Sequence, residues 1–288
     1  MPQPLARIVD QLKREPSRTG SIIITVFGDA IVPRGGSVWL GTVLQFFEAL
    51  DIDGSVVRTA MSRLAADGWL EREKVGRNSF YRLAASGHRT FEAATRHIYD
   101  PPPSIWNGRF ELLLIGKATD REVSREALRN AGFGSPLPGV WVAPSGVPIP
   151  EEAASAIRLE VSAEDESGRH LLSESWPLDR TAEAYLKFMK SFGPLRSWLG
   201  RRARLSELEA FTTRILLIHH YRRVVLRDPL LPLALLPGNW PGNAARALCG
   251  EIYRAVLPAS EQWLDHHGLN ESGPLPPAVT ELARRFRG

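Results

Sequence analysis

Ser55–Asp67 reads SVVRTAMSRLAAD, and the chain continues GWLEREKVGRNSFYRL as far as Leu83. The apolar residues of the first stretch recur at the spacing of one helix face, namely Val57, Ala60, Met61 and Leu64. This spacing predicts an amphipathic helix that packs its apolar side on a core. We expect Ser55 to cap the N-terminus of the helix and Gly68 to follow its C-terminus, where φ is positive.

The opposite face of this helix carries short hydroxyl side chains and guanidinium groups: Ser55, Arg58, Thr59, Ser62 and Arg63. Glu and Lys, which usually cover a surface helix, are absent from it. Side chains of these types reach base edges and phosphates from a helix that lies in the major groove. The pattern therefore favours a DNA-recognition helix over an ordinary amphipathic helix.

The residues after Gly68 predict a β-hairpin with a basic tip. Alternation in Leu70–Lys74 and a second run in Ser79–Leu83 flank the turn VGRN, in which Gly and Asn suit positive φ. The cations on or near the tip are Arg72, Lys74 and Arg77. Residues 55–82 contain six Lys or Arg against three Asp or Glu. A basic hairpin directly after a recognition helix is typical of a wing that meets phosphate or the minor groove; the alternative is a hairpin with a structural role only.

Two further helices precede this segment, over Ser21–Ile31 and Leu40–Leu50. The residues DIDG, from Asp51 to Gly54, form the turn before the recognition helix, and we interpret Asp51 or Asp53 as a cap instead of a catalytic acid. The order helix, helix, turn, helix and hairpin predicts a winged helix-turn-helix from Gly20 to Leu83.

We expect an α+β protein of three domains: a winged helix-turn-helix domain (1–100), a ferredoxin-like α+β domain (101–177) and a helical C-terminal domain (178–288). A helix over Ala84–Tyr99 and the linker Pro101–Pro103 end the first domain. The middle domain is expected to contain a strand Arg109–Ile115, a helix Arg121–Ala131, and strands Val140–Ala143 and Ile157–Val161. The last domain should contain helices over Thr181–Gly193 and Leu205–Leu226, and a short basic helix over Val279–Arg287.

Composition excludes several classes of protein. Of the 288 residues, 43% are hydrophobic and 24% are charged, and the net charge is +4, as in an ordinary globular protein that tolerates a nucleic-acid partner. No apolar run approaches the roughly 20 residues of a membrane span, and no signal peptide is recognisable, so we expect a cytoplasmic protein. Cys249 is the single cysteine; it excludes an internal disulfide, and we expect it to be a small buried side chain.

Two blocks of sequence carry a resemblance to a known family. The first contains FGD (Phe27–Asp29), RGGSVWLG (Arg34–Gly41), VRTAMSRL (Val57–Leu64), GWL (Gly68–Leu70) and GRNSFYRL (Gly76–Leu83). The second contains Tyr221 and Arg222, RDPLLP (Arg227–Pro232) and LLPGNWPG (Leu235–Gly242). These motifs resemble the PaaX family of bacterial repressors, which control aromatic-acid catabolism such as phenylacetate degradation, and the similarity spans about residues 20–260.

The resemblance implies a middle ferredoxin-like domain related to a CRISPR adaptation nuclease, a helical C-terminal domain, and a homodimer on a palindromic double-stranded operator. It also implies release of the DNA by an aryl-coenzyme A thioester, of which phenylacetyl-CoA is the best-known example. We expect no catalytic residues, no metal and no cofactor. A metal nuclease would want an acid at the end of its first strand, and Gly116 and Lys117 stand there instead.

One cluster of residues suggests an effector site: His219, His220, Tyr221, Arg222, Arg223 and Trp240. The arginines suit coenzyme A phosphates, and the aromatic rings suit stacking on an aryl or adenine ring. The alternative is structural, with histidines packed in a helix and arginines paired with Glu207, Glu209 or Asp228. Adjacent helix positions point about 100° apart, so His219 and His220 are poorly placed to chelate one metal ion.

Two other functions stay open. One is a winged-helix protein-interaction module without an effector, in which Arg58 and Arg63 face an acidic partner. The other is a degenerate nuclease-like protein that uses the middle domain.

Overall fold

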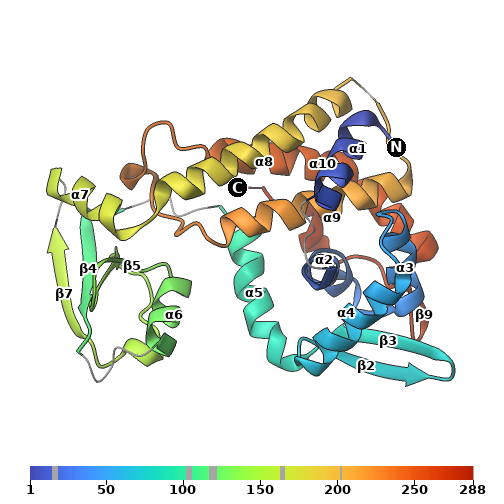
Figure 1. The fold of residues 1–288 in the computed structure, drawn as a ribbon, viewed down its shortest axis with the longest axis horizontal. Helices are drawn as coiled ribbons and strands as arrows, with labels where there is room; N and C mark the ends of the chain where they lie inside the picture. The colour runs from blue at the N-terminus through green and yellow to red at the C-terminus, as the bar shows by residue number, and fades with distance from the viewer. Residues whose placement is uncertain (15–18, 102–105, 117–121, 163–165, 202, 288) are drawn as a thin grey trace. The chain divides into compact units, whose positions relative to one another are not determined.

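The computed structural model describes residues 1–14, 19–101, 106–116, 122–162, 166–201 and 203–287 (Figure 1). The chain is an α+β protein that forms two compact units. The first contains Met1–Asp100, Lys187–Arg223 and Asn243–Gly288, and the second contains Pro101–Leu186 and Val224–Gly242. The C-terminal residues are therefore shared between the two units, and the division into three consecutive domains stays a prediction.

The N-terminal part of the first unit is a group of short helices followed by a hairpin. Its elements are α1 (Gln3–Arg14), α2 (Thr19–Val26), the π-helical turn η1 (Phe27–Ile31), the 3-10 turn η2 (Val32–Arg34), β1 (Ser37–Trp39), α3 (Leu40–Glu48), α4 (Gly54–Ala66), β2 (Leu70–Val75), β3 (Asn78–Leu83) and α5 (Ala85–Tyr99). The strands form an antiparallel sheet in the order β1-β3-β2. In Figure 1, α4 lies beside the β2–β3 hairpin.

The predicted buried face of α4 and the predicted glycine turns are confirmed. Val57 and Met61 are fully buried on the apolar face of α4. Gly68 and Gly76 adopt φ values of +74° and +59°, which allow the chain to leave α4 and to turn between β2 and β3. The expected helix Ser21–Ile31 differs from the structure, since it is α-helical only to Val26 and then widens into η1.

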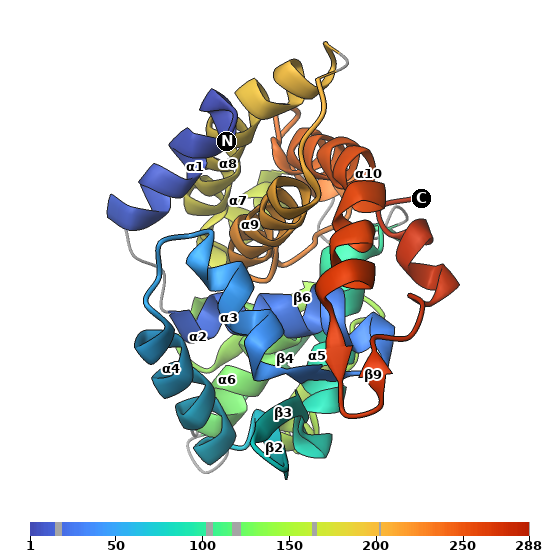
Figure 2. The same ribbon diagram turned by 90° about the vertical axis from the view of Figure 1, so that its right-hand side faces the viewer.

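The C-terminal part contains long helices, in agreement with the predicted helical character. They are α8 (Leu178–Leu199), α9 (Glu207–Val225) and α10 (Gly242–His267), followed by a small hairpin of β8 (Leu269–Asn270) and β9 (Gly273–Pro274) and by the 3-10 turn η5 (Thr280–Arg284). In Figure 2, β9 lies near the end of the first unit that contains β3. An ion pair between Arg82 of β3 and Glu271, which lies between β8 and β9, connects the two hairpins.

The predicted basic helix over Val279–Arg287 is wrong. Only Thr280–Arg284 are helical, as a 3-10 turn, and Arg285 is already extended. Phe286 then adopts a left-handed φ of +60°. The chain leaves the helix because Arg285 and Phe286 turn inward and pack among buried aromatic side chains.

The second unit is built on an antiparallel sheet in the order β5-β6-β4-β7. Its elements are β4 (Arg109–Leu114), α6 (Glu122–Asn130), β5 (Gly134–Leu137), β6 (Val140–Pro144), the 3-10 turn η3 (Glu151–Ala153), β7 (Ile157–Ser162), α7 (Glu166–Ser175) and the 3-10 turn η4 (Leu233–Leu235). The predicted strands and helix all occur here, although Pro102, Pro103, Lys117 and Arg121 lie outside the described residues.

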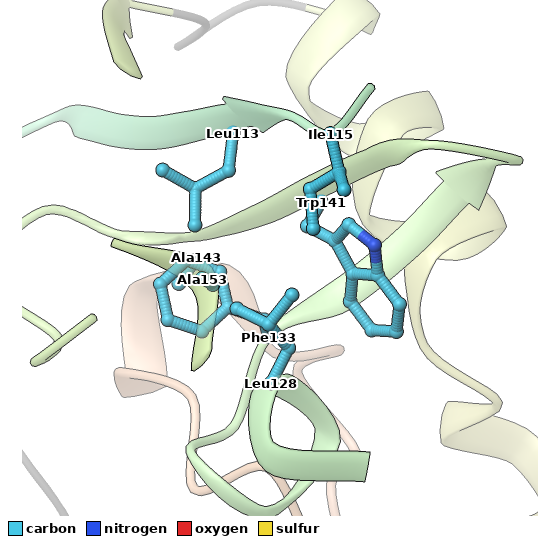
Figure 3. Packing of buried hydrophobic residues seen from close by; sticks show 7 residues of the cluster. All are labelled: Leu113, Ile115, Leu128, Phe133, Trp141, Ala143 and Ala153. Carbon is cyan, nitrogen blue, oxygen red and sulfur yellow. The ribbon is translucent and has the colours of Figure 1, made fainter. Parts of the chain in front are cut away.

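Both faces of this sheet are packed. On one face Leu113 and Trp141 meet Leu128 of α6 and Phe133, as Figure 3 shows. The other face packs Phe110 and Val142 against α7 and the loop around η4. Neighbouring residues of β4 therefore contribute to two cores, as the alternation of side chains along a strand requires.

Candidate nucleic-acid interface

The start of α4 is fixed by an aspartate. Asp53 is the N-cap residue, and its Oδ1 accepts hydrogen bonds from the Ser55 backbone N (2.7 Å) and from Ser55 Oγ (2.5 Å). These bonds, the side-chain one first, lower the pKa of the Asp53 carboxyl. The expectation that Ser55 caps the helix is therefore wrong, because the helix begins one residue before it. The expectation that Asp51 or Asp53 is a cap is confirmed for Asp53.

The predicted polar face of α4 is exposed at all five positions: Ser55, Arg58, Thr59, Ser62 and Arg63. Two of its hydroxyl groups already donate locally, that of Ser55 to Asp53 and that of Thr59 to the Ser55 carbonyl oxygen (2.9 Å). The donors that remain for a ligand are therefore those of Arg58, Ser62 and Arg63.

The β2–β3 hairpin has two faces of different charge. Successive side chains of a strand point to opposite sides, so Arg72 and Lys74 lie on one face and Glu71 and Glu73 on the other. The acidic face is neutralised in part by Arg82, whose guanidinium group contacts Glu73 (2.8 Å) and Glu271 (3.0 Å). The basic face keeps its charge, although Arg72 Nη2 donates to Ser79 Oγ (2.9 Å).

Three cations of this surface have no ion-pair partner in the described part of the chain. Within the described part of the chain, Arg63, Lys74 and Arg77 form no ion pair, and all three are exposed. Arg58 lies close enough to Asp53 to lower the pKa of that carboxyl further. Cations without an internal partner, on a helix and the adjoining hairpin, form a surface that suits a polyanion.

The predicted effector residues are partly interior. His219 is fully buried, with Nδ1 3.4 Å from Thr25 Oγ1, and burial lowers its pKa to about 3. Tyr221 is also buried, and its ring centroid lies 5.5 Å from that of Phe188. His220 is half-buried beside Phe192. These contacts agree with the structural alternative for this helix.

The two arginines differ in their surroundings. Arg222 Nη2 donates to the backbone oxygen of Ser21 (2.9 Å) and to its Oγ (2.8 Å), which joins α9 to α2 within the first unit. Arg223 is exposed. Trp240 belongs to the second unit, where its ring meets Tyr185 edge to face at 6.0 Å. The acids considered as arginine partners have others: Glu207 contacts His266, Glu209 the N-terminal amine and Asp228 the Tyr185 hydroxyl.

The first unit contains a buried charged cluster that the sequence patterns do not predict. Asp29 of η1 accepts hydrogen bonds from Tyr99, Tyr253, Arg214 and Arg285. Burial raises the pKa of Tyr253 to about 12, so its hydroxyl keeps its proton and donates. An acid inside the otherwise apolar run ITVFGDAIV was the available signal, because a carboxylate in a core needs partners.

The described residues give no support for a metal site or for a membrane-spanning helix. In that part of the chain, no three side chains of His, Cys, Asp or Glu gather as metal ligands. No described helix combines the length and the apolar character needed to cross a membrane. Cys249 is buried as expected, and burial raises the pKa of its thiol.

Comparison with known proteins identifies the family. The model of the PaaX-like protein family matches residues 18–87, and that of the PaaX-like protein C-terminal domain matches residues 176–266. The transcriptional repressor PaaX of Escherichia coli strain K12 is 35% identical over 284 residues, covering 93% of this chain and 90% of the repressor. The solved structure of an uncharacterised protein from Mycobacterium tuberculosis aligns with a TM-score of 0.52 at 22% identity, covering 77% of this chain and 90% of that one, and supports the fold alone. The chain therefore belongs to the PaaX-like family and is a transcriptional regulator, not an enzyme.

Proposed function

We propose that the protein is a repressor that binds operator DNA as a homodimer through a winged helix-turn-helix from Gly20 to Leu83. The observation that carries this proposal is the exposed face of α4 beside the basic face of the β2–β3 hairpin, with Arg63, Lys74 and Arg77 unpaired in the described part of the chain. The Escherichia coli relative is a transcriptional repressor, which supports the same role for this chain.

The order of elements supports the winged-helix interpretation. The helices α2, α3 and α4 precede the hairpin β2–β3, and β1 joins the hairpin as a third antiparallel strand. In this arrangement α4 is the recognition helix and the hairpin is the wing. Two such helices in a dimer would occupy successive major grooves about 34–36 Å apart.

Salt dependence of DNA binding tests this function. We expect the protein to bind DNA from upstream of its own gene, with a slope of log K against log salt concentration on the order of −4 or steeper, because each neutralised phosphate contributes about −0.9. Fluorescence anisotropy from 50 to 300 mM salt measures the slope, with unrelated DNA of equal length as the control. Absence of preferential binding to the upstream DNA would contradict the proposal.

The connectivity of the second unit supports a ferredoxin-like domain. The chain runs β4, α6, β5, β6, η3 and β7, and the sheet order is β5-β6-β4-β7. This is a β-α-β-β-α-β arrangement in which the 3-10 turn η3 takes the place of the second helix. In this sheet order β7 is an edge strand, so one of its sides is free to pair with another chain.

We assign the dimer contact to β7. Its side chains are exposed from Ile157 to Glu160, and Ile157 and Leu159 are 63% and 43% exposed. Antiparallel pairing with a second copy, centred on Leu159, would put Arg158 opposite Glu160 and Leu159 opposite itself. The apolar character is thus self-complementary, and an exposed strand edge is a template for pairing. Within the chain Arg158 already contacts Glu111, and Glu160 contacts Arg109, so the apolar pair carries the proposed contact.

A charge on the edge strand tests the dimer. Leu159→Lys places two like charges opposite each other in the proposed pairing and should convert the dimer to a monomer in sedimentation experiments. Leu137→Lys, at an exposed position of the other edge strand β5, is the matched control and should stay dimeric. A dimeric Leu159→Lys protein would rule out this interface, and a monomeric parent protein would rule out the homodimer.

We propose an aryl-CoA thioester, phenylacetyl-CoA in the first instance, as the effector that releases DNA. The family resemblance supports this class. Release requires that the ligand bind the DNA-free state more tightly than the bound state. Phenylacetyl-CoA should lower the affinity for DNA at concentrations where phenylacetate and coenzyme A have no effect. Equal DNA affinity with and without the thioester would refute this choice of effector.

The two other functions are not favoured. The relative with 35% identity is a repressor, which argues against a module that binds only proteins. A nuclease would need carboxylates near β4, but Glu111 is buried and binds Arg158, with Arg158 Nη2 donating to Glu111 Oε2 at 2.8 Å. Lys117, at the position after β4 where a metal nuclease would have an acidic residue, lies outside the described residues.

A further inference from the structure

We infer that the second unit holds a small-molecule site in a pocket of about 640 Å³ between α7, the start of α8 and the loop around η4. We call it the tryptophan pocket; its lining includes Trp106, Leu172, Trp176, Arg180, Ala234 and Pro237. The inference rests on the proposed function in one respect: the occupant would be the aryl end of the effector. This pocket does not include the residues around His219 that the sequence suggested as an effector site.

Two indole rings form rigid walls of the tryptophan pocket. Trp176 Nε1 donates to the Gly132 carbonyl oxygen (3.1 Å), and Trp106 Nε1 donates to the Arg109 carbonyl oxygen (2.9 Å). Because the protein satisfies both N–H groups, the indole surface left for a ligand is apolar. Gly134 makes room for Trp176, since a Cβ there would lie 2.6 Å from the ring.

A strained turn precedes the loop that contributes Ala234–Pro237 to the lining. Leu230 adopts φ of +49°, and its backbone N donates to Asp228 Oδ1 (2.8 Å). The other carboxylate oxygen of Asp228 accepts a hydrogen bond from the buried Tyr185 hydroxyl (2.7 Å). A residue other than glycine is strained at positive φ and keeps this conformation only where its surroundings hold it. The bonds of Asp228 therefore anchor the start of the loop in which Leu235 and Pro237 line the pocket.

The rim of the tryptophan pocket carries one charge of each sign. Asp179 and Arg180, in the first turn of α8, both line it and both are exposed. Arg180 forms no ion pair or hydrogen bond within the described part of the chain. A chain with amide groups can donate to Asp179 and accept from Arg180, whereas a free carboxylate can only accept.

Size and chemistry together define the ligand class. The volume lies within the roughly 300–1,000 Å³ of small-molecule sites, which are typically apolar and aromatic with a few polar groups. The apolar lining, which includes Trp106 and Trp176, suits a flat apolar group, and Arg180 at the rim suits a polar chain attached to it. An aromatic acyl thioester supplies both the flat group and the polar chain, whereas the corresponding free acid lacks the chain.

Filling the pocket tests the assignment. Ala234 is exposed and lines the pocket, so Ala234→Phe should occupy the ligand volume without disturbing the core. We expect calorimetry with phenylacetyl-CoA to show an affinity at least tenfold weaker than that of the parent, with an unchanged Tm and unchanged DNA binding in the absence of ligand. Ala154→Phe, at an exposed position of the same unit that does not line the pocket, is the matched control and should bind as the parent does.

The outcomes separate the pocket from the proposed effector response. If phenylacetyl-CoA releases DNA equally from the parent and from Ala234→Phe, the effector proposal stands and the pocket assignment is overturned. If filling the pocket abolishes ligand binding but the parent keeps its DNA when saturated with ligand, the pocket stands and release fails. If the parent binds phenylacetate as tightly as phenylacetyl-CoA, or binds neither, the ligand class assigned to this pocket is wrong.

Discussion

Arg214 Nε lies 2.6 Å from Asp29 Oδ2, and both side chains are excluded from solvent. Asp29 belongs to η1, which leads through β1 into α3, whereas Arg214 belongs to α9. Arg285, near the end of the chain, donates to Asp29 Oδ1 at 2.7 Å. One carboxylate therefore joins the N-terminal helices to α9 and to the C-terminal segment within the first unit.

Removal of this carboxylate should destabilise the first unit. Asp29→Ala leaves the buried Arg214 and Arg285 without their shared counter-charge, and breaking a buried pair typically costs about 3–5 kcal/mol. Urea unfolding followed by circular dichroism measures the loss. Arg82→Ala is the control, since its ion pairs are solvent-exposed and should contribute less than about 1 kcal/mol. A loss of the same size in both variants would disprove a special role for Asp29.

The C-terminal segment should contribute to the same stability. Phe286 is nearly buried, with ring centroids 5.2 Å from Tyr99 and 5.5 Å from Tyr253. Phe286→Ala should lower the free energy of unfolding by about 3–5 kcal/mol, because it leaves a cavity among these rings. Phe286→Leu should lose less. Equal stability of Phe286→Ala and the parent would show that the segment does not support the cluster.

Acid should weaken the fold through His219. Its folded-state pKa is lowered to about 3, mainly by burial and then by His220, Arg222 and Arg223, whereas its ordinary value is 6.5. The unfolded chain thus binds the proton more readily, so His219 favours folding above pH 6.5 and this contribution is lost as pH falls from 6.5 toward 3. The slope is about 1.4 kcal/mol per pH unit.

A variant isolates the His219 contribution from that of the carboxylates. His219→Gln removes the titrating group, so the stability lost between pH 7 and pH 5 should be smaller than in the parent by about 2 kcal/mol. Urea midpoints at the two pH values give this difference directly. Identical pH dependence in parent and variant would mean that His219 does not titrate between the folded and unfolded states.

Local patterns predicted the elements that depend on neighbouring residues. The spacing of Val57 and Met61 identified the buried face of α4, and Gly76 identified the hairpin turn, because helix period and turn geometry are set within a few residues. The sequence offers both Ser55 and Asp53 as caps near the start of α4, and only the backbone geometry, which selects Asp53, decides between them.

The features that depend on distant contacts could not be predicted in this way. The partners of Asp29 lie 70 residues away at Tyr99 and 185 at Arg214, beyond the reach of any periodicity. The residues from His219 to Arg222 looked like a ligand site because their chemistry suits coenzyme A, but sequence does not show that α9 is packed on several sides. The tryptophan pocket joins Trp106, α7 and the loop around η4, which are far apart in the chain.

Binding of the upstream DNA by an Arg58→Ala/Arg63→Ala double variant tests the central claim most directly. Both side chains are exposed, so the variant should keep the parent Tm. Arg196→Ala, at an exposed position on α8, is the matched control and should bind as the parent does. We predict that the double variant binds at least a hundredfold more weakly at 150 mM salt and discriminates poorly between upstream and unrelated DNA, in line with about 1–3 kcal/mol for each arginine that reads a base. A folded double variant that binds the upstream DNA as tightly and as selectively as the parent would contradict the assignment of α4 as the recognition helix.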